Sequence, residues 1–291
     1  MKKSVITIGT FDGIHKGHKA IIDKVVEVSK EKKLKSIVIS LERPIKKVNG
    51  LLTLPDEKTE ILSSFSIDEI LILPHDKNII SMTAEAFFNE VLINQLNVKH
   101  IVVGYDCAFG KDRKGNIIWL KKITKEHDIS LDIIKPVMVG RETVSSSKIR
   151  SLIQKNDVSL ANNMLGRIFE ISGEKISGNR IGRTLGFPTI NVKVDKDKIL
   201  PKGVFVCSIA DKTGRIFPGV LNIGIRPTVN IIKHNLSVEV HLLSFSGKWK
   251  EKKIKILLYK HIRNEKKFTN LNCLKKAVTK DINTARRFFS L

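Results

Sequence analysis

Two histidines three residues apart stand in a glycine-rich segment near the start of the chain, Gly9-Thr10-Phe11-Asp12-Gly13-Ile14-His15-Lys16-Gly17-His18. An apolar run precedes this segment, and apolar residues at helical spacing follow it. In a parallel sheet, ligands bind at such a strand-to-helix turn, because the free N–H groups and partial positive charge of the helix start attract phosphate. Both imidazoles could donate hydrogen bonds to phosphate oxygens. We predict a nucleotide site here; a histidine metal pair and two ordinary surface histidines are the alternatives, although no third metal ligand is evident.

A second glycine-rich segment runs from Gly178 to Asn191 and reads Gly-Asn-Arg-Ile-Gly-Arg-Thr-Leu-Gly-Phe-Pro-Thr-Ile-Asn. It is not a P-loop, because the chain contains no G-x-x-x-x-G-K-[ST] pattern. Glycines four residues apart with two arginines predict a flexible cationic flap over a polyphosphate, and a structural turn is the alternative. Thr189 and Asn191, alternating on a strand, would present oxygens to one side, which suits Mg²⁺.

Glu239 is a carboxylate among apolar residues, with Val238, Val240 and Leu242 around it in an alternating pattern. Such a position needs a reason, because a buried charge is unfavourable without a partner. One interpretation is a solvent-facing position on an edge strand. The other is a general base that accepts a proton from a substrate hydroxyl.

The elements that must position these residues fall into two halves. In the first half, strand-like runs alternate with helical patterns, which predicts a parallel sheet covered on both faces. The predicted strands are 5–8, 36–41, 69–73, 100–103 and 131–134, and the predicted helices include 19–30, 56–64 and 83–96. In the second half, short strands predict an antiparallel barrel closed by one C-terminal helix. Those strands are 169–171, 204–209, 219–223, 238–243 and 254–258, the helix is 271–289, and 147–165 is interpreted as a helix plus connector.

Composition limits the classes of partner. The 291 residues carry 52 Lys+Arg against 29 Asp+Glu, a net charge of +23, but only 12 of the basic residues are Arg and aromatic residues make up 6%. Surfaces that bind nucleic acids usually rely on Arg and aromatic side chains, so we interpret the excess as a lysine-rich solvated surface and expect no nucleic-acid partner. The chain has no apolar run long enough for a membrane span, and its three scattered cysteines are typical of a reducing compartment. We therefore expect a cytoplasmic protein with no membrane partner.

The first motif carries a resemblance to a known family. In the form G-T-F-D-G-x-H-x-G-H it is similar to the amino-terminal half of bacterial bifunctional riboflavin kinase/FMN adenylyltransferase (FAD synthetase). Two further segments resemble elements of that half: Gly104-Tyr105-Asp106-Cys107-Ala108-Phe109-Gly110, and Ser145-Ser146-Ser147-Lys148-Ile149-Arg150.

The second motif resembles the kinase half of the same family. Gly186-Phe187-Pro188-Thr189-Ile190-Asn191 is similar to its G-F-P-T-A-N signature, with Ile190 in place of Ala. Other kinase elements recur in order, at Gly203-Val204-Phe205, at 222–228, at 238–241 and at 263–268. The resemblance covers nearly the whole chain and implies a Rossmann-like nucleotidyltransferase domain at 1–163 and a β-barrel riboflavin kinase domain with a terminal helix at 164–291.

The resemblance also implies two reactions and the residues that serve them. The barrel would phosphorylate riboflavin to FMN with ATP, and the first domain would adenylylate FMN to FAD with release of pyrophosphate, both with Mg²⁺. The implied catalytic residues are His15, His18 and Glu239. For adenylyl transfer, the implied ATP contacts are Gly9, Thr10, Phe11, Asp12, Gly17, Ser146, Ser147 and Arg150, and the FMN contacts are Asp106, Phe109 and Gly110. For the kinase, the implied ATP contacts are Gly178, Gly182, Arg183, Gly186, Pro188 and Thr189, the flavin-side residues are Arg226, Arg263 and Phe268, and the metal ligands are Thr189 and Asn191.

One departure from the family pattern keeps a first alternative open, and the first motif itself leaves a second. The family's Phe-x-Pro-His-Pro element after the second strand is replaced by Leu41-Glu42-Arg43-Pro44, and Arg43 could supply a positive charge there. The first alternative is a riboflavin kinase with a degenerate adenylyltransferase domain. The more distant alternative is an RNA-binding nucleotidyltransferase-like protein, since H-x-G-H is also akin to the histidine signature of class I tRNA synthetases. Oligomeric state is not predicted.

Overall fold

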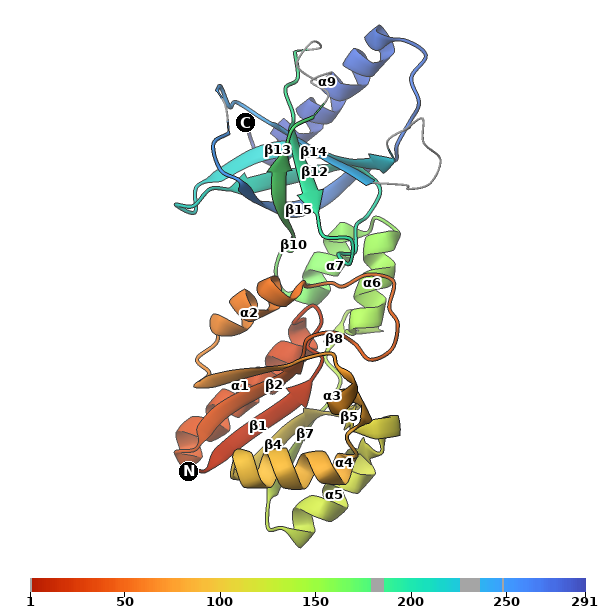
Figure 1. Ribbon diagram of the computed structural model, residues 1–291. Coiled ribbons are helices and arrows are strands. Elements are labelled where there is room, and N and C mark those ends of the chain that lie inside the picture. The colour runs from red at the N-terminus through yellow and green to blue at the C-terminus, as the bar shows by residue number, and fades with distance from the viewer. Residues whose placement is uncertain (1, 179–185, 226–235, 248) are drawn as a thin grey trace. The chain divides into compact units, whose positions relative to one another are not determined.

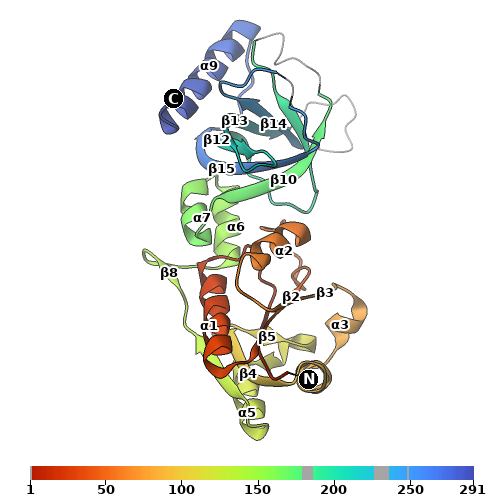
Figure 2. The same ribbon diagram turned by 90° about the vertical axis from the view of Figure 1, so that its left-hand side faces the viewer.

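The computed structural model describes the chain except residues 1, 179–185, 226–235 and 248. The chain divides into two compact units, Met1–Ser146 and Ser147–Leu291 (Figures 1 and 2).

The first unit is built on a five-stranded parallel sheet with the order β3-β2-β1-β4-β7. The strands are β1 (Ser4–Gly9), β2 (Lys35–Leu41), β3 (Glu69–Leu73), β4 (Val98–Gly104) and β7 (Ser130–Ile134). All five predicted strands are confirmed. The chain builds outward from β1 through β2 to β3 and then returns to place β4 on the other side of β1. This reversal between β1 and β4 is the point where open parallel sheets bind ligands, beyond the carboxyl ends of the strands.

Helices cover both faces of this sheet, as the two views show (Figures 1 and 2). They are α1 (Lys16–Lys32), α2 (Pro55–Ser63), α3 (Lys77–Ser81), α4 (Ala84–Ala86), the π-helix η1 (Phe87–Gln95), the 3₁₀ turn η2 (Lys111–Arg113) and α5 (Ile117–Glu126). Alternate residues of each strand point to opposite faces of the sheet. Ile6 belongs to a core cluster with residues of η1 and α5, whereas Val5 belongs to one with residues of α1. The helix predicted over 83–96 is divided between α4 and η1. The sequence pattern did not predict α5, which begins where the Asn116 side chain accepts hydrogen bonds from two backbone N–H groups.

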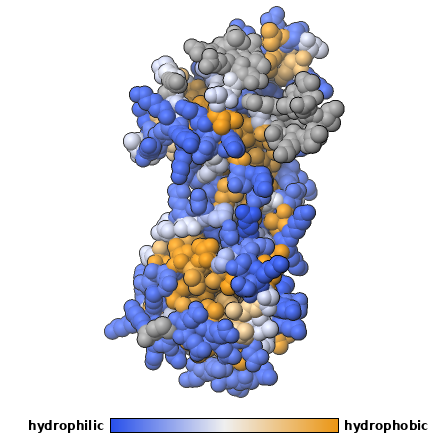
Figure 3. Space-filling view, viewed as in Figure 1, coloured by the Kyte–Doolittle hydropathy of each residue, from blue (hydrophilic) through white to orange (hydrophobic). Residues whose placement is uncertain are grey.

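The core of the first unit reaches the surface at the β3 edge of the sheet. Leu41 of β2 and Leu71 of β3 are partly buried, whereas Ile39 is fully buried. In Figure 3, apolar residues gather on the side of the first unit that faces the viewer. Two short ribbons complete the unit, β5 (Ala108–Phe109) with β6 (Gly115–Asn116), and β8 (Met138–Val139) with β9 (Glu142–Thr143).

The second unit is a closed antiparallel barrel with the strand order β10-β11-β14-β13-β12-β15. The strands are β10 (Phe169–Ile176), β11 (Ile190–Val194), β12 (Gly203–Ala210), β13 (Ile216–Ile225), β14 (Leu236–Leu242) and β15 (Lys253–Arg263). Helix α6 (Ser146–Gln154) begins at the unit boundary, and α7 (Val158–Leu165) contacts β10 and β15. The predicted barrel is therefore confirmed, and the segment predicted as a helix plus connector forms two helices.

Helix α9 (Leu271–Phe288) packs on the outside of the barrel. Val204 and Val206 of β12 contact Ile282 and Ala285 of the helix, whereas Phe205 lies on the other side of β12 and is completely buried. None of the described helices is both long and apolar enough to cross a membrane.

The three free cysteines differ in their exposure, which gives a test of the fold. Burial raises the pKa of the Cys107 thiol to about 12 and raises that of Cys207 still further, while Cys273 on α9 is exposed. At pH 8, we expect one thiol of the folded protein to react rapidly with Ellman's reagent and three to react after denaturation. Cys273→Ser should remove the fast phase. Rapid reaction of all three thiols in the folded protein would contradict these placements.

Candidate functional site

The first site lies at the carboxyl ends of β1 and β4. The loop after β1 runs from Gly9 to the start of α1, and the loop after β4 runs from Gly104 to Gly110. The Cys107 thiol lies 3.9 Å from the Ile8 carbonyl oxygen, so the loop after β4 meets the end of β1 where the strand order reverses. The structure thus brings together two of the segments that the sequence singled out.

Asp12 holds the loop after β1 in place. Its side chain is buried and accepts hydrogen bonds from the Thr53 N–H at 2.9 Å and the Leu52 N–H at 3.2 Å. The Thr53 hydroxyl oxygen also accepts a hydrogen bond from the Gly13 N–H at 3.0 Å. Phe11 and Gly13 have positive φ values of 47° and 88°, which turn the chain sharply. Asp12 was predicted as an ATP contact, and in the structure its carboxylate is directed to the backbone of the 52–53 segment.

The two histidines lie together at the start of α1. His15 is the N-cap residue, and its Nδ1 accepts a hydrogen bond from the His18 N–H at 3.3 Å. A neutral His15 ring therefore carries its proton on Nε2. The two rings stack with centroids 3.6 Å apart, and the His18 ring also meets Phe11 edge-on at 5.1 Å. The spacing that suggested a shared direction for the two side chains does place the rings side by side.

Gly17 lies in the first turn of α1, where space is limited. A Cβ added at Gly17 would lie 3.1 Å from the His15 ring, and one added at Gly9 would lie 3.2 Å from the Phe11 ring. A larger residue at Gly17 would therefore press on the imidazole. These two glycines permit the close packing of the loop on its own side chains.

In the loop after β4, the predicted FMN contacts Asp106 and Phe109 differ in their exposure. Asp106 is exposed, whereas Phe109 is buried and packs against Phe87 and Trp119 at centroid distances of 5.6 and 5.8 Å. A Cβ at Gly110, whose φ is +69°, would collide with the backbone of Ala84. The Phe109 ring therefore anchors the loop in the core, and Asp106 is on its accessible side.

The serine segment begins helix α6. The Ser146 hydroxyl donates a hydrogen bond to the Asp12 carbonyl oxygen at 2.8 Å, which ties the start of the helix to the first loop. Ser147 and Arg150 follow on α6 and belong to the second unit.

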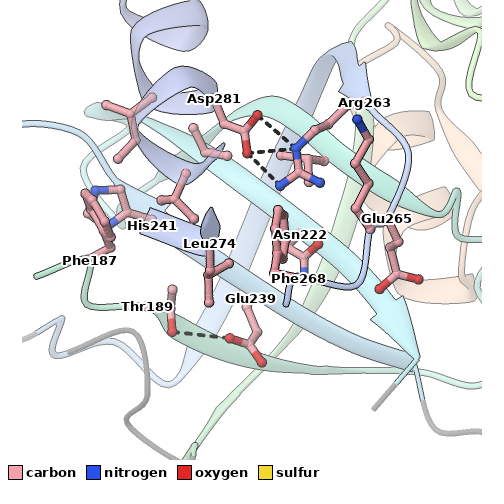
Figure 4. A pocket seen from close by; sticks show the side chains of 15 residues that line it. Phe187, Thr189, Asn222, Glu239, His241, Arg263, Glu265, Phe268, Leu274 and Asp281 are labelled. Atoms are coloured by element: carbon pink, nitrogen blue, oxygen red, sulfur yellow. Dashed lines mark hydrogen bonds and ion pairs between the residues drawn. The ribbon is translucent and has the colours of Figure 1, made fainter. Parts of the chain in front are cut away.

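The second unit contains a cavity of about 360 Å³ between the outer face of the barrel and α9 (Figure 4). It is lined by Phe187, Thr189, Val204, Val220, Asn222, Glu239, His241, Arg263, Glu265, Lys266, Phe268, Leu274, Val278, Asp281 and Ile282. The lining combines apolar side chains with a few polar groups, which is typical of sites that bind small molecules.

Glu239 points into this cavity, away from the barrel interior. Val238 and Val240, its neighbours on β14, are buried inside the barrel, and β14 lies between β11 and β13. The edge-strand interpretation is therefore wrong, because a closed barrel has no edge at β14. The Glu239 carboxylate accepts hydrogen bonds from the Ser237 hydroxyl at 2.8 Å and the Thr189 hydroxyl at 3.4 Å.

Oxygen donors gather beside Glu239. Asn191 on β11 and Asn222 on β13 are its direct cross-strand partners, so all three side chains share the outer face. The Thr189 hydroxyl donates its proton to Glu239 and retains its lone pairs. A Cβ at Gly178 would collide with the amide of Asn191, so this glycine leaves room for that side chain. Hydroxyl, amide and carboxylate oxygens are the donor set that Mg²⁺ prefers, and their position fits such an ion.

The opposite wall of the cavity holds an ion pair that the sequence did not reveal. Arg263 lies at the end of β15, and its Nε–H is shared between the two carboxylate oxygens of Asp281 on α9, each at 3.1 Å. Its guanidinium NH₂ group donates a second hydrogen bond to Asp281 at 2.8 Å. The Asp281 side chain is 5% exposed, and the Arg263 guanidinium lies 5.5 Å from the centroid of the Phe268 ring. Arg263 and Phe268, both predicted on the flavin side, are therefore brought together in the structure (Figure 4).

Of the remaining predicted residues of this unit, the structure describes Pro188 and Gly186. The Pro188 carbonyl oxygen lies 2.9 Å from His241 Nδ1, and Gly186 is exposed with a φ of +86°. Gly182, Arg183 and Arg226 lie outside the described residues. Within the described ranges, no group of three or more His, Cys, Asp and Glu side chains could hold a metal ion.

Comparison with known proteins separates the chain into the same two halves. A family model described as FAD synthetase matches residues 1–148, and one described as riboflavin kinase matches residues 165–289. A bifunctional riboflavin kinase/FMN adenylyltransferase from Buchnera aphidicola subsp. Schizaphis graminum is 36% identical over 99% of this chain and 95% of its own length. The protein of the same description from Escherichia coli K12 is 35% identical over 99% of this chain and 93% of its own length.

A solved structure also matches nearly the whole chain. It is described as a macrolide-efflux protein from Streptococcus pneumoniae and superposes with a TM-score of 0.87 at 25% sequence identity. The match covers 98% of this chain and 94% of the other.

The Arg263–Asp281 pair gives a test of the cavity wall. In Asp281→Asn, Arg263 would face a neutral partner, and we expect the second unit to lose about 1–3 kcal/mol of unfolding free energy. Trp249 is in the second unit, so its fluorescence in a Trp119→Phe background reports the unfolding of this unit in denaturant. Lys280→Gln, at the neighbouring exposed position, is the control and should leave the midpoint unchanged. Equal midpoints for Asp281→Asn and the control would contradict the role of the pair.

Proposed function

This chain belongs to the family of bifunctional riboflavin kinase/FMN adenylyltransferases, and we propose that its two sites catalyse successive steps of flavin cofactor synthesis. The barrel phosphorylates riboflavin to FMN, and the parallel-sheet unit adenylylates FMN to FAD. The observation that carries this proposal is that each of the two family models matches the half of the chain whose site suits its reaction.

In the kinase reaction, Glu239 acts as the general base. Its carboxylate accepts the proton of the riboflavin 5′-hydroxyl, whose oxygen attacks the γ-phosphorus of ATP while ADP leaves. The hydrogen bonds from Ser237 and Thr189 orient the carboxylate toward the cavity. Thr189 and Asn191 would hold Mg²⁺, which neutralises phosphate charge when it is bound. Arg263, fixed by Asp281, and Phe268 would contact the flavin side.

Adenylyl transfer requires no protein nucleophile. The FMN phosphate attacks the α-phosphorus of ATP and pyrophosphate leaves, so the protein's task is to position the phosphates and to neutralise their charge. His15 through Nε2, His18 and the partial positive charge at the start of α1 serve the phosphates. Ser146, Ser147 and Arg150 hold the pyrophosphate, and Asp106 faces FMN on a loop that Phe109 anchors.

The two alternatives explain less of the chain. A riboflavin kinase with a degenerate first domain leaves unexplained the FAD synthetase match over 1–148 and the paired histidines. An RNA-binding protein leaves unexplained the whole kinase half. We propose riboflavin, FMN and ATP as the partners, a cytoplasmic location, and domains at 1–163 and 164–291.

Product analysis tests the proposal directly. Purified protein is incubated with riboflavin, ATP and Mg²⁺, and the flavins are separated by chromatography. We expect FMN followed by FAD. FMN alone would support the kinase-only alternative, and no flavin product together with salt-sensitive RNA binding would overturn the proposal.

Substitutions at the two sites should separate the two activities. Glu239→Gln should lower riboflavin phosphorylation by about 10²- to 10⁴-fold because the base is lost, while adenylylation of supplied FMN continues. His15→Asn, which keeps a side-chain acceptor for the helix start, should lower adenylylation by about 10²- to 10³-fold and leave the kinase unchanged. Glu174→Gln, an exposed glutamate on β10, is the control. Loss of both activities in either variant would contradict the assignment of separate sites.

A further inference from the structure

Lys58 is a buried lysine beside the first site, and neither the motifs nor the resemblance pointed to it. It lies on α2 and is only 1% exposed. Burial of an ammonium group is unfavourable unless hydrogen bonds and charges compensate for the lost hydration. A methionine or leucine would fill the same space without this penalty. The position therefore calls for a role beyond packing.

The contacts of Lys58 connect the ends of two neighbouring strands. Its Nζ donates to the Thr10 carbonyl oxygen at 2.8 Å, just after β1, and to those of Leu41 at 2.6 Å and Glu42 at 3.2 Å, at the end of β2. The Ser40 hydroxyl oxygen, at 3.3 Å, is a fourth acceptor, and this hydroxyl also lies 3.2 Å from the Thr10 carbonyl oxygen. One ammonium group thus gathers three backbone carbonyls at the carboxyl edge of the sheet.

Lys58 contacts both the loop after β1 and the segment that departs from the family pattern. Thr10 begins the loop that leads to His15, and Leu41 and Glu42 begin the segment that replaces the family's Phe-x-Pro-His-Pro element. Without a cation, three carbonyl oxygens would face one another at this edge. Their repulsion would move the loop after β1 away from the end of β2.

We propose that Lys58 is a positioning residue for adenylyl transfer, whose ammonium group holds the loop after β1 in the geometry that places His15 and His18 on the phosphates. This inference rests on the proposed function of the first unit and adds a residue to it. Lys58 acts through the Thr10 carbonyl and touches neither substrate.

The charge of Lys58 can be tested through pH. Burial lowers its pKa from 10.5 to about 8, and the charged groups that act on it are Asp12, in the loop after β1, and Glu42, after β2, both of which favour the protonated form. The charged contacts are therefore present below pH 8 and weaken as the pH rises through about 8. In the unfolded chain, Lys58 keeps its proton up to a pH of about 10.5. The unfolded state therefore binds more protons between about pH 8 and 10.5, and the contribution of Lys58 to the free energy of unfolding rises as the pH increases through this range. Activity and this part of the stability should thus change in opposite directions.

The experiment uses the full chain, with the kinase as an internal reference. In the wild type, we expect kcat for FMN adenylylation to fall between pH 7 and 9.5 with a midpoint near 8, while riboflavin phosphorylation and the unfolding midpoint show no parallel loss. Lys58→Met should adenylylate FMN about 10²-fold more slowly at pH 7, because the loop is misplaced, and should lack this high-pH decline. Lys121→Met, at an exposed lysine of α5, should stay within about twofold of the wild type at every pH.

Several outcomes would overturn the inference. A folded Lys58→Met that adenylylates FMN like the wild type would exclude a positioning role and would leave the proposed function intact. If Lys58→Met does not fold, the wild-type profile decides, and a kcat that stays constant to pH 9.5 would overturn the role. Absence of adenylylation by the wild type at every pH would overturn both the proposed function and this inference.

Discussion

Two buried charges of opposite sign hold the turn after β1, on which the first site depends. The Asp12 carboxylate accepts hydrogen bonds from backbone N–H groups of the 52–53 segment, and the Lys58 ammonium donates to backbone carbonyls on the other side of the turn. Backbone groups at a strand end have lost their partners in the sheet and need others when they are buried. Once these are satisfied from within the protein, the turn holds the start of α1, whose partial positive charge favours an anionic ligand.

The second site follows from a different constraint, the closure of a barrel. Closure removes sheet edges and directs alternate residues of every strand inward, so the residues between them face outward. On β14 the inward residues are Val238 and Val240, and Glu239 is consequently on the outer face, where α9 covers part of the surface. The cavity lies between barrel and helix, and the outward residues of β11, β13 and β14 line one wall of it, opposite Arg263 and Asp281.

The large positive charge of the chain has little part in either site. Lys58 and Lys198 are buried among the described lysines, whereas lysines such as Lys19 and Lys122 form exposed pairs along their helices. Exposed pairs of this kind contribute little to stability. The charge that bears on adenylyl transfer is local, and at Lys58 it acts on backbone carbonyls.

Local pattern in the sequence determined the five parallel strands, most barrel strands and the two motifs, because side-chain alternation and glycine-rich turns are encoded over a few residues. Residue type and spacing singled out His15, His18 and Glu239, and the resemblance implied their catalytic roles. The tertiary structure alone decided the roles of Asp281 and Lys58, because an acidic residue on α9 and a lysine on α2 look like ordinary helix-surface residues until their partners are known. Those partners lie 18 and up to 48 positions away along the chain, and only the packing of helix on barrel or sheet brings them within hydrogen-bonding distance.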